Sequence, residues 1–113
     1  MRLIARHLVT TAAIGTLLSL APAIASAASA EAGKAVFAAK CKSCHGDDGA
    51  GNPKIAAMMK VEMKPLGGEE IQKKSDADLK GIITNGSGKM PAQKTVTGAD
   101  VDNVVAAIRA LKK

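Results

Sequence analysis

The chain has almost no aromatic side chains: its 113 residues include one Phe, Phe37, and neither Trp nor Tyr. Aromatic residues supply much of the buried area in small cores, and a domain of this size usually needs a cross-link, metal or other staple. The lack of stacking aromatics and the modest positive charge also argue against a nucleic-acid-binding protein. We therefore expect a single small domain whose interior is filled by something other than aromatic side chains.

The first thirty residues differ in composition from the rest. A positively charged start with two arginines precedes an apolar run over residues 8–20, and small residues follow. Three A-x-A cleavage sites end at Ala25, Ala27 and Ala30. This layout predicts that residues 1–30 are a secretory signal peptide that is removed, leaving the domain 31–113 in the periplasm without a stable membrane span. A retained helical anchor is the alternative, although the apolar run is short for a bilayer.

Convincing strand-like alternation is absent from residues 31–113, whereas apolar residues recur at helical spacing. The expected helices cover residues 31–40, 76–85 and 101–111, with a shorter apolar piece at 55–59. Ser75 is the predicted N-cap of the second helix and Gly86 its predicted stop. Thr97-Gly98-Ala99-Asp100 resembles another helix start, and Gly33 allows a close helix crossing. The pattern predicts an all-α fold.

Both cysteines lie in KCKSCHG, residues 40–46, beside His45, the single histidine of residues 31–113. Two cysteines and one adjacent histidine do not supply the four ligands of a structural zinc site. A redox dithiol of the thioredoxin type follows a strand, and no strand is predicted here. A disulfide between residues three apart closes a very small loop and stabilises little. The remaining interpretation is C-x-x-C-H, the attachment motif for c-type haem.

The chemistry of covalent haem accounts for each residue of the motif. The thiols of Cys41 and Cys44 add across the two vinyl groups, and the adjacent His45 brings an imidazole nitrogen to the iron. A bulky, flat cofactor would also fill an interior that lacks aromatic side chains. The sequence therefore predicts one haem c per chain.

A haem that passes electrons usually has a second axial ligand, and with no other histidine in the domain a methionine is the natural candidate. The domain contains Met58, Met59, Met63 and Met90. Met90 stands in the loop NGSGKMPA, where Pro91 biases its backbone toward an extended conformation and the glycines allow close approach to a flat ring. Met63, in an irregular segment, remains a competitor.

Several segments together resemble a known family. They are Gly33 and Phe37 in the opening helix, Cys41-Lys42-Ser43-Cys44-His45, the helix ending at Gly86, Lys89-Met90-Pro91, and the terminal helix 101–111. Over essentially the whole domain, the chain resembles the class I cytochromes c, specifically the small soluble monohaem type of bacteria. The resemblance implies a cytochrome c-like fold, with three main helices and a short one wrapped around a covalently bound haem. It also implies haem attachment at Cys41 and Cys44, with His45 and Met90 as the axial ligands.

The resemblance implies one further contact and includes one departure. In this family a proline carbonyl commonly accepts the N–H of the proximal histidine, which suggests that role for Pro53. The family often has an aromatic residue in the last helix where it crosses the first. This chain has Val105-Ala106-Ala107-Ile108 in that region, so the crossing must rely on aliphatic packing.

The resemblance implies an electron-transfer protein rather than an enzyme, a carrier that exchanges single electrons with larger redox partners. Lysines in or beside the segments expected around the haem could steer it toward acidic docking surfaces. They are Lys42, Lys54, Lys60, Lys64, Lys89 and Lys94. Two alternatives remain open at this point: a haem-based sensor of a small ligand, and a haem subunit of a larger oxidoreductase complex.

Overall fold

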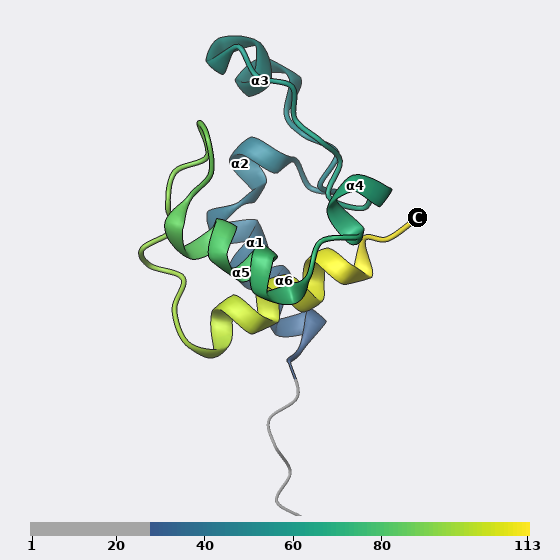
Figure 1. Cartoon of the computed structure of the whole chain (residues 1–113), viewed down its shortest axis with the longest axis vertical. Helices are drawn as coiled ribbons and strands as arrows, with labels where there is room; N and C mark the ends of the chain where they lie inside the picture. The colour runs from purple at the N-terminus through teal and green to yellow at the C-terminus, as the bar shows by residue number, and fades with distance from the viewer. Residues whose placement is uncertain (1–27) are drawn as a thin grey trace, which may run out of the picture.

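Six helices connected by loops make up the described part of the chain, a computed structural model that covers residues 28–113. They are α1 (Ala30–Lys40), α2 (Lys42–His45), α3 (Pro53–Met59), α4 (Glu69–Gln72), α5 (Asp76–Asn85) and α6 (Ala99–Ala110). Residues 28–113 contain no strand beyond one isolated bridge between Ser87 and Met90. The all-α prediction is confirmed. The three long helices lie where they were expected, accompanied by three short helices instead of one (Figure 1).

The crossing of α1 and α6 is the most extensive helix contact in the described residues. A Cβ atom on Gly33 would lie only 1.8 Å from the backbone oxygen of Asn103, so only glycine fits there. Ser29 caps α1 by accepting from the Ala32 N–H at 3.1 Å, and its own N–H donates to Asn103 Oδ1 at 2.8 Å. The predicted close crossing at Gly33 is confirmed.

The core beneath this crossing is aliphatic except for Phe37, which is 7% exposed. Its members are Phe37, Leu66, Leu79, Ile83, Val96, Val101, Val104, Val105 and Ile108. Polar contacts secure α6 at its C-terminal end. Arg109 donates to the carbonyl oxygens of Gln72 and Lys74 at 2.7 and 2.6 Å, and Gln72 Nε2 donates to the Ile108 carbonyl at 2.9 Å. These contacts hold the segment between α4 and α5 against α6.

The helix boundaries follow the local sequence signals closely. Ser75 Oγ accepts from the Asp78 N–H at 3.0 Å, and Gly86 ends α5 with φ of 79°, both as predicted. The start of α6 differs in detail, because Gly98 with φ of 57° is the N-cap and no side chain caps the helix. The short α4 was not predicted, although its two acidic residues directly after a glycine pair are a typical helix start.

The predicted signal peptide lies outside the described residues except for residues 28–30. Of those three, Ser29 and Ala30 form the cap and first residue of α1. Within residues 28–113, the helices are all too short or too polar to cross a membrane.

Candidate haem site

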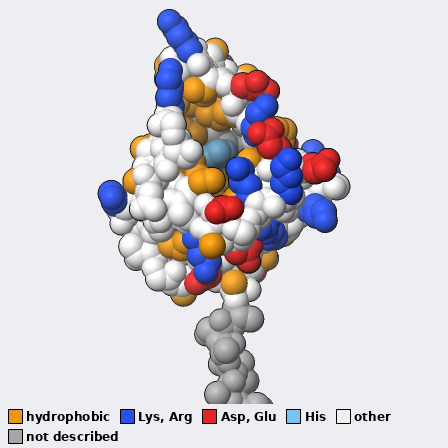
Figure 2. All heavy atoms as spheres, viewed as in Figure 1, with side chains coloured by type: hydrophobic (Ala, Val, Ile, Leu, Met, Phe, Trp, Pro, Cys, Tyr) orange, Lys and Arg blue, Asp and Glu red, His pale blue; other side chains and the backbone are white. Residues whose placement is uncertain are grey.

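A cavity of about 450 Å³ opens between α2, the segment after α3, and the face of α5 and α6. This volume lies within the range of about 300–1,000 Å³ typical of cofactor sites. Figure 2 shows a histidine side chain inside a hollow surrounded by hydrophobic side chains, and His45 is the one histidine of the described residues. The four candidate site residues, Cys41, Cys44, His45 and Met90, all line the cavity. The fold therefore brings together residues that lie up to 49 positions apart in the sequence.

Cys41 is the N-cap of α2, and the other four residues of the C-x-x-C-H motif form its single turn. The His45 N–H donates to the Cys41 carbonyl at 2.9 Å, and Gly46, with φ of 77°, ends the turn. One helical turn presents both thiols and the imidazole to the same cavity because residues three and four apart share a helix face. Both cysteines are free, and burial, followed by the neighbouring Cys44, raises the pKa of the Cys41 thiol.

His45 has an unusual environment for a polar side chain. Its Nδ1 is buried and lacks a hydrogen-bond partner, the single such side-chain atom in the described residues. Burial also lowers the pKa of the imidazole, which favours the neutral form that can bind a metal. An orphaned buried nitrogen is costly, so its presence beside two thiols points to a site built for a bound group.

The predicted hydrogen bond from His45 to the Pro53 carbonyl is wrong in this structure, because Nδ1 has no partner. Pro53 is the first residue of α3, and carbonyls at that position point along the helix axis toward the following turn. The loop is instead tied to α2 through the backbone, where the Gly51 N–H donates to the His45 carbonyl at 2.7 Å.

Met90 lines the same cavity and stands at the end of a tight turn. Its N–H donates to the Ser87 carbonyl at 2.9 Å, and its own carbonyl accepts from the Ser87 N–H at 3.0 Å. Gly86 makes the turn possible, since a Cβ there would lie 2.7 Å from the Met90 carbonyl oxygen. The backbone of Met90 is thus fixed to the end of α5 by short-range contacts.

Two other methionines, Met59 and Met63, also line the cavity. Met63 packs against Gly51, whose added Cβ would lie 3.0 Å from the Met63 Cβ. Met58 points away and is 74% exposed. The structure therefore separates Met58 from the site, whereas Met59 and Met63 share the cavity with Met90.

The charges around the cavity differ from the predicted set of lysines. Only Lys64 and Lys89 of that set line it, joined by Lys40 and Lys74, which the sequence reasoning missed. Lys64 pairs with Glu62 and Glu70 at 3.0 and 3.6 Å. The cavity margin is therefore mixed in charge, as the basic and acidic side chains beside the hollow in Figure 2 also show.

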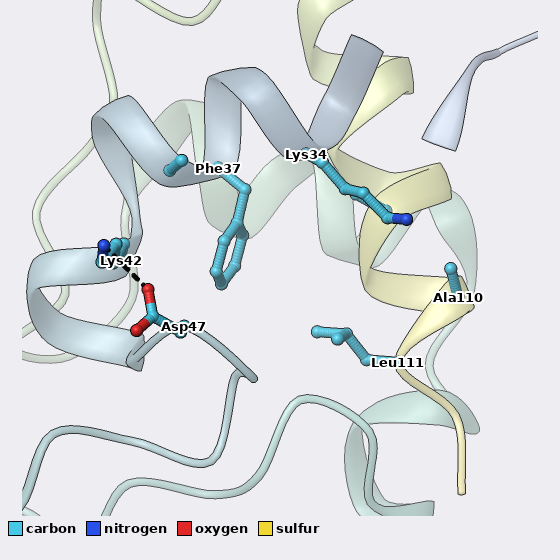
Figure 3. A pocket seen from close by; sticks show the side chains of 8 residues that line it. Lys34, Phe37, Lys42, Asp47, Ala110 and Leu111 are labelled. Atoms are coloured by element: carbon cyan, nitrogen blue, oxygen red, sulfur yellow. Dashed lines mark ion pairs between the residues drawn. The ribbon is translucent and has the colours of Figure 1, made fainter. Parts of the chain in front are cut away.

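A second hollow of about 410 Å³ lies against α1 and α6, and neither cysteine lines it (Figure 3). Phe37 lines both cavities, and Ala107, Ala110 and Leu111 contribute the apolar wall here. The Lys42–Asp47 ion pair, at 2.8 Å, stands at one side. On the α6 side, the hollow is bounded by the small side chains of Ala107 and Ala110, which face Phe37. This agrees with the lack of an aromatic residue in the last helix.

Three features of the residues that line the larger cavity fit a haem. Its walls are mainly aliphatic, from Leu66, Leu79, Ile83, Val104 and Ile108, among others. Its polar groups include two free thiols and an imidazole with an orphaned nitrogen. Imidazole and thioether are an established pair of haem iron ligands. Within residues 28–113, no group of three or more His, Cys, Asp or Glu side chains is placed to hold a metal ion by itself.

Comparison with known proteins gives the family. Residues 28–106 match the family described as cytochrome C oxidase, cbb3-type, subunit III. A solved structure described as KustC0563 c-type cytochrome superposes with a TM-score of 0.61 at 26% sequence identity, covering 72% of this chain and 98% of that one. The comparison with curated proteins gives no match. Because the family match spans more than half of the sequence, the chain belongs to this family and is a small c-type cytochrome.

Proposed function

We propose that the protein is an exported carrier of single electrons with one covalently attached haem c, and that it is not an enzyme in its own right. The observation that carries this proposal is the convergence of Cys41, Cys44, His45 and Met90 on one apolar cavity. Membership of a c-type cytochrome family supports it. The polypeptide holds the cofactor and partner proteins supply and accept the electron.

Each site residue has a distinct part in this proposal. Cys41 and Cys44 would hold the haem through two thioether bonds, and His45 and Met90 would bind its iron. When bound, haem c supplies an iron that gains and loses one electron. The thioether of Met90 favours the reduced iron, and the aliphatic walls exclude water and disfavour the additional positive charge of the oxidised state.

The positions of the ligands suit rapid electron transfer. Hydrogen bonds in the backbone fix His45 on α2 and Met90 on its turn. Ligands held this way move little between oxidation states, so little reorganisation accompanies the electron. Lys40, Lys74 and Lys89 lie at the cavity margin, and they would attract a redox partner with an acidic surface. Export to the periplasm fits the predicted signal peptide, because haem attachment of this type takes place outside the cytoplasm in the resembling bacterial family.

The first experiment is the visible spectrum of the exported protein before and after extraction in denaturant. We expect haem absorbance to remain with the polypeptide, and to be lost from the chain in the double variant Cys41→Ser/Cys44→Ser. A colourless parent chain, or colour fully extracted by denaturant, would overturn the proposal.

The second experiment tests the distal ligand. We expect the oxidised protein to show the far-red methionine-to-iron absorption band, to lose it in Met90→Ala, and to retain it in the control Met63→Ala. Loss of the band in Met63→Ala alone would assign that residue instead. A high-spin spectrum of the parent protein at neutral pH would favour the sensor of a small ligand over the electron carrier.

A second candidate function is that of a haem subunit in a larger oxidoreductase. The family description, which names an oxidase subunit, favours it. The solved c-type cytochrome that superposes on the chain is nearly covered along its full length, which favours a separate small protein. Co-purification from the source membrane under mild conditions distinguishes the two: a stable stoichiometric complex supports the subunit, and recovery of the free chain supports the carrier.

A further inference from the structure

Lys89, the residue immediately before Met90, joins two parts of the molecule that lie far apart in sequence. Its Nζ donates to the Met59 carbonyl oxygen at 2.5 Å. Met59 is the last residue of α3, and carbonyls at a helix C-terminus have no partner within the helix. A lysine ammonium is a favourable partner for such a carbonyl. Both Lys89 and Met59 line the large cavity.

The segment that carries α3 has few other contacts. Figure 1 shows α3 apart from the remaining helices, and α3 is absent from the helix pairs with substantial contact in the described residues. Its N-terminal end is tied to α2, because the Asn52 N–H donates to the Cys44 carbonyl at 2.8 Å and Asn52 Nδ2 to the Ser43 carbonyl at 3.1 Å. Its C-terminal end is tied to the Met90 turn through Lys89.

These two ties make α3 a bridge across the cavity. One end is attached to the helix that carries His45, and the other to the turn that carries Met90. Hydrogen bonds between Ser87 and Met90 hold the backbone of the Met90 turn. The turn is attached to α5 at its base, where the Gln93 N–H donates to the Ile83 carbonyl at 2.8 Å. The Lys89–Met59 hydrogen bond is therefore the contact that closes the bridge.

We propose that Lys89 is a positioning residue, which holds α3 against the Met90 turn and so limits both the displacement of Met90 and the entry of competing ligands. This inference rests on the proposed function for the role of Met90, while the hydrogen bond itself belongs to the polypeptide. Lys89 touches neither iron nor haem in this proposal and acts through Met90. The role differs from partner steering, because it requires the hydrogen bond rather than the charge alone.

The test uses the haem-loaded protein and three variants: Lys89→Ala, Lys89→Arg, and the control Lys94→Ala. Lys94 is exposed, and no hydrogen bond or ion pair of its side chain occurs in the described residues. The Lys94→Ala variant therefore removes the same positive charge as Lys89→Ala but no hydrogen bond to α3. Imidazole is added to the oxidised protein, and its displacement of the methionine ligand is followed by loss of the far-red band. Because a single exposed hydrogen bond is removed, we expect imidazole to bind about threefold to tenfold more tightly to Lys89→Ala. Lys89→Arg should restore the parent affinity, and Lys94→Ala should not alter it.

A second readout follows the bridge without reference to the iron. Glutamyl endopeptidase cleavage after the exposed Glu62, three residues beyond α3, reports opening of this segment. We expect faster cleavage at Glu62 in Lys89→Ala, with cleavage at Glu31 in α1 unchanged. Equal behaviour of Lys89→Ala and Lys94→Ala in both assays would overturn the proposal, and so would failure of Lys89→Arg to restore the parent values. A parent protein with no methionine-to-iron band would contradict the proposed function instead, and the Glu62 cleavage rates would still decide whether Lys89 closes the bridge.

Discussion

The α1–α6 crossing and the segment from Gly46 to Lys64 differ sharply in how the polypeptide holds them. At the crossing, backbones approach so closely that an added Cβ on Gly33 would overlap the Asn103 carbonyl. Val104 beside it is 1% exposed. In the other segment, α3 has no buried residue, and Met58 is 74% exposed.

Close packing therefore stabilises the crossing, whereas a few hydrogen bonds stabilise the segment that carries α3. Burial of apolar area is the dominant favourable contribution to folding, and α1 and α6 supply most of it. The segment with α3 buries little area and depends on hydrogen bonds at its ends, so we expect it to open locally at low cost. Both regions border the cavity. The crossing contributes closely packed apolar wall residues, and the segment with α3 contributes a margin that is held by single contacts.

The largest expected effect is that of Gly33→Ala. The new methyl group would overlap backbone atoms of α6, which cannot move aside as a flexible side chain can. We expect a loss of about 3 kcal/mol or more in the free energy of unfolding, measured by denaturant titration of the haem-loaded protein. The matched control is Gly81→Ala in α5, where an added Cβ meets no atom within 4 Å. It should stabilise the protein by about 0.5–1 kcal/mol, and equal losses in the two variants would contradict the close-crossing explanation.

A smaller contrast comes from truncating one side chain in each region. Val104→Ala removes two buried methyl groups and leaves a cavity, so we expect a loss of about 2 kcal/mol. Met58→Ala changes an exposed side chain and should alter stability by no more than about 0.5 kcal/mol. Thermal unfolding of both variants measures the difference, and a destabilised Met58→Ala would indicate that α3 packs more extensively than the structure describes.

The smallest effects concern the helix caps. Ser29 caps α1, and Asn52 caps α3 by accepting from the Lys54 N–H at 3.1 Å. Removing either cap as an alanine variant should cost about 1 kcal/mol locally. We expect Ser29→Ala to lower the free energy of global unfolding, whereas Asn52→Ala should accelerate hydrogen exchange within α3 and leave global unfolding nearly unchanged. A global loss in Asn52→Ala equal to that of Ser29→Ala would remove the distinction between the two regions.

The caps also bear on the predicted signal peptide. Ser29 both caps α1 and donates to Asn103. Cleavage after Ala25 or Ala27 would retain these contacts, and cleavage after Ala30 would remove them. Because these contacts stabilise α1, we propose cleavage after Ala25 or Ala27 in place of the boundary after residue 30 that the sequence pattern predicts, and the mass of the exported protein distinguishes these sites.

Much of the architecture could be predicted from local patterns. Ser75 and Gly86 bound α5 as expected, because capping and termination depend on a few neighbouring residues. The apolar stripe of α6 is buried along its length for the same reason, since helical periodicity places its members on one face. The candidate site residues could be named because C-x-x-C-H is a compact motif and Met90 has few competitors.

The contacts between distant segments could not be predicted in this way. The packing of the helices places Lys40 and Lys74 at the cavity. Lys42 does not line the cavity and instead forms an ion pair with Asp47. The expected contact of Pro53 with His45 is absent, and Pro53 is instead the first residue of α3, where the backbone carbonyl is directed along the helix.

The sequence alone determined the helical class and most of the helix ends, because periodicity and capping are local properties, and its short KCKSCHG motif predicts covalent haem attachment. Only the tertiary structure decided that Met59 and Met63 share the cavity with Met90, that His45 Nδ1 has no partner, and that Lys89 reaches the end of α3. The methionines and Lys89 lie 27 to 31 positions from the residues that they meet, and these arrangements depend on the packing of the whole chain rather than on any short segment of it.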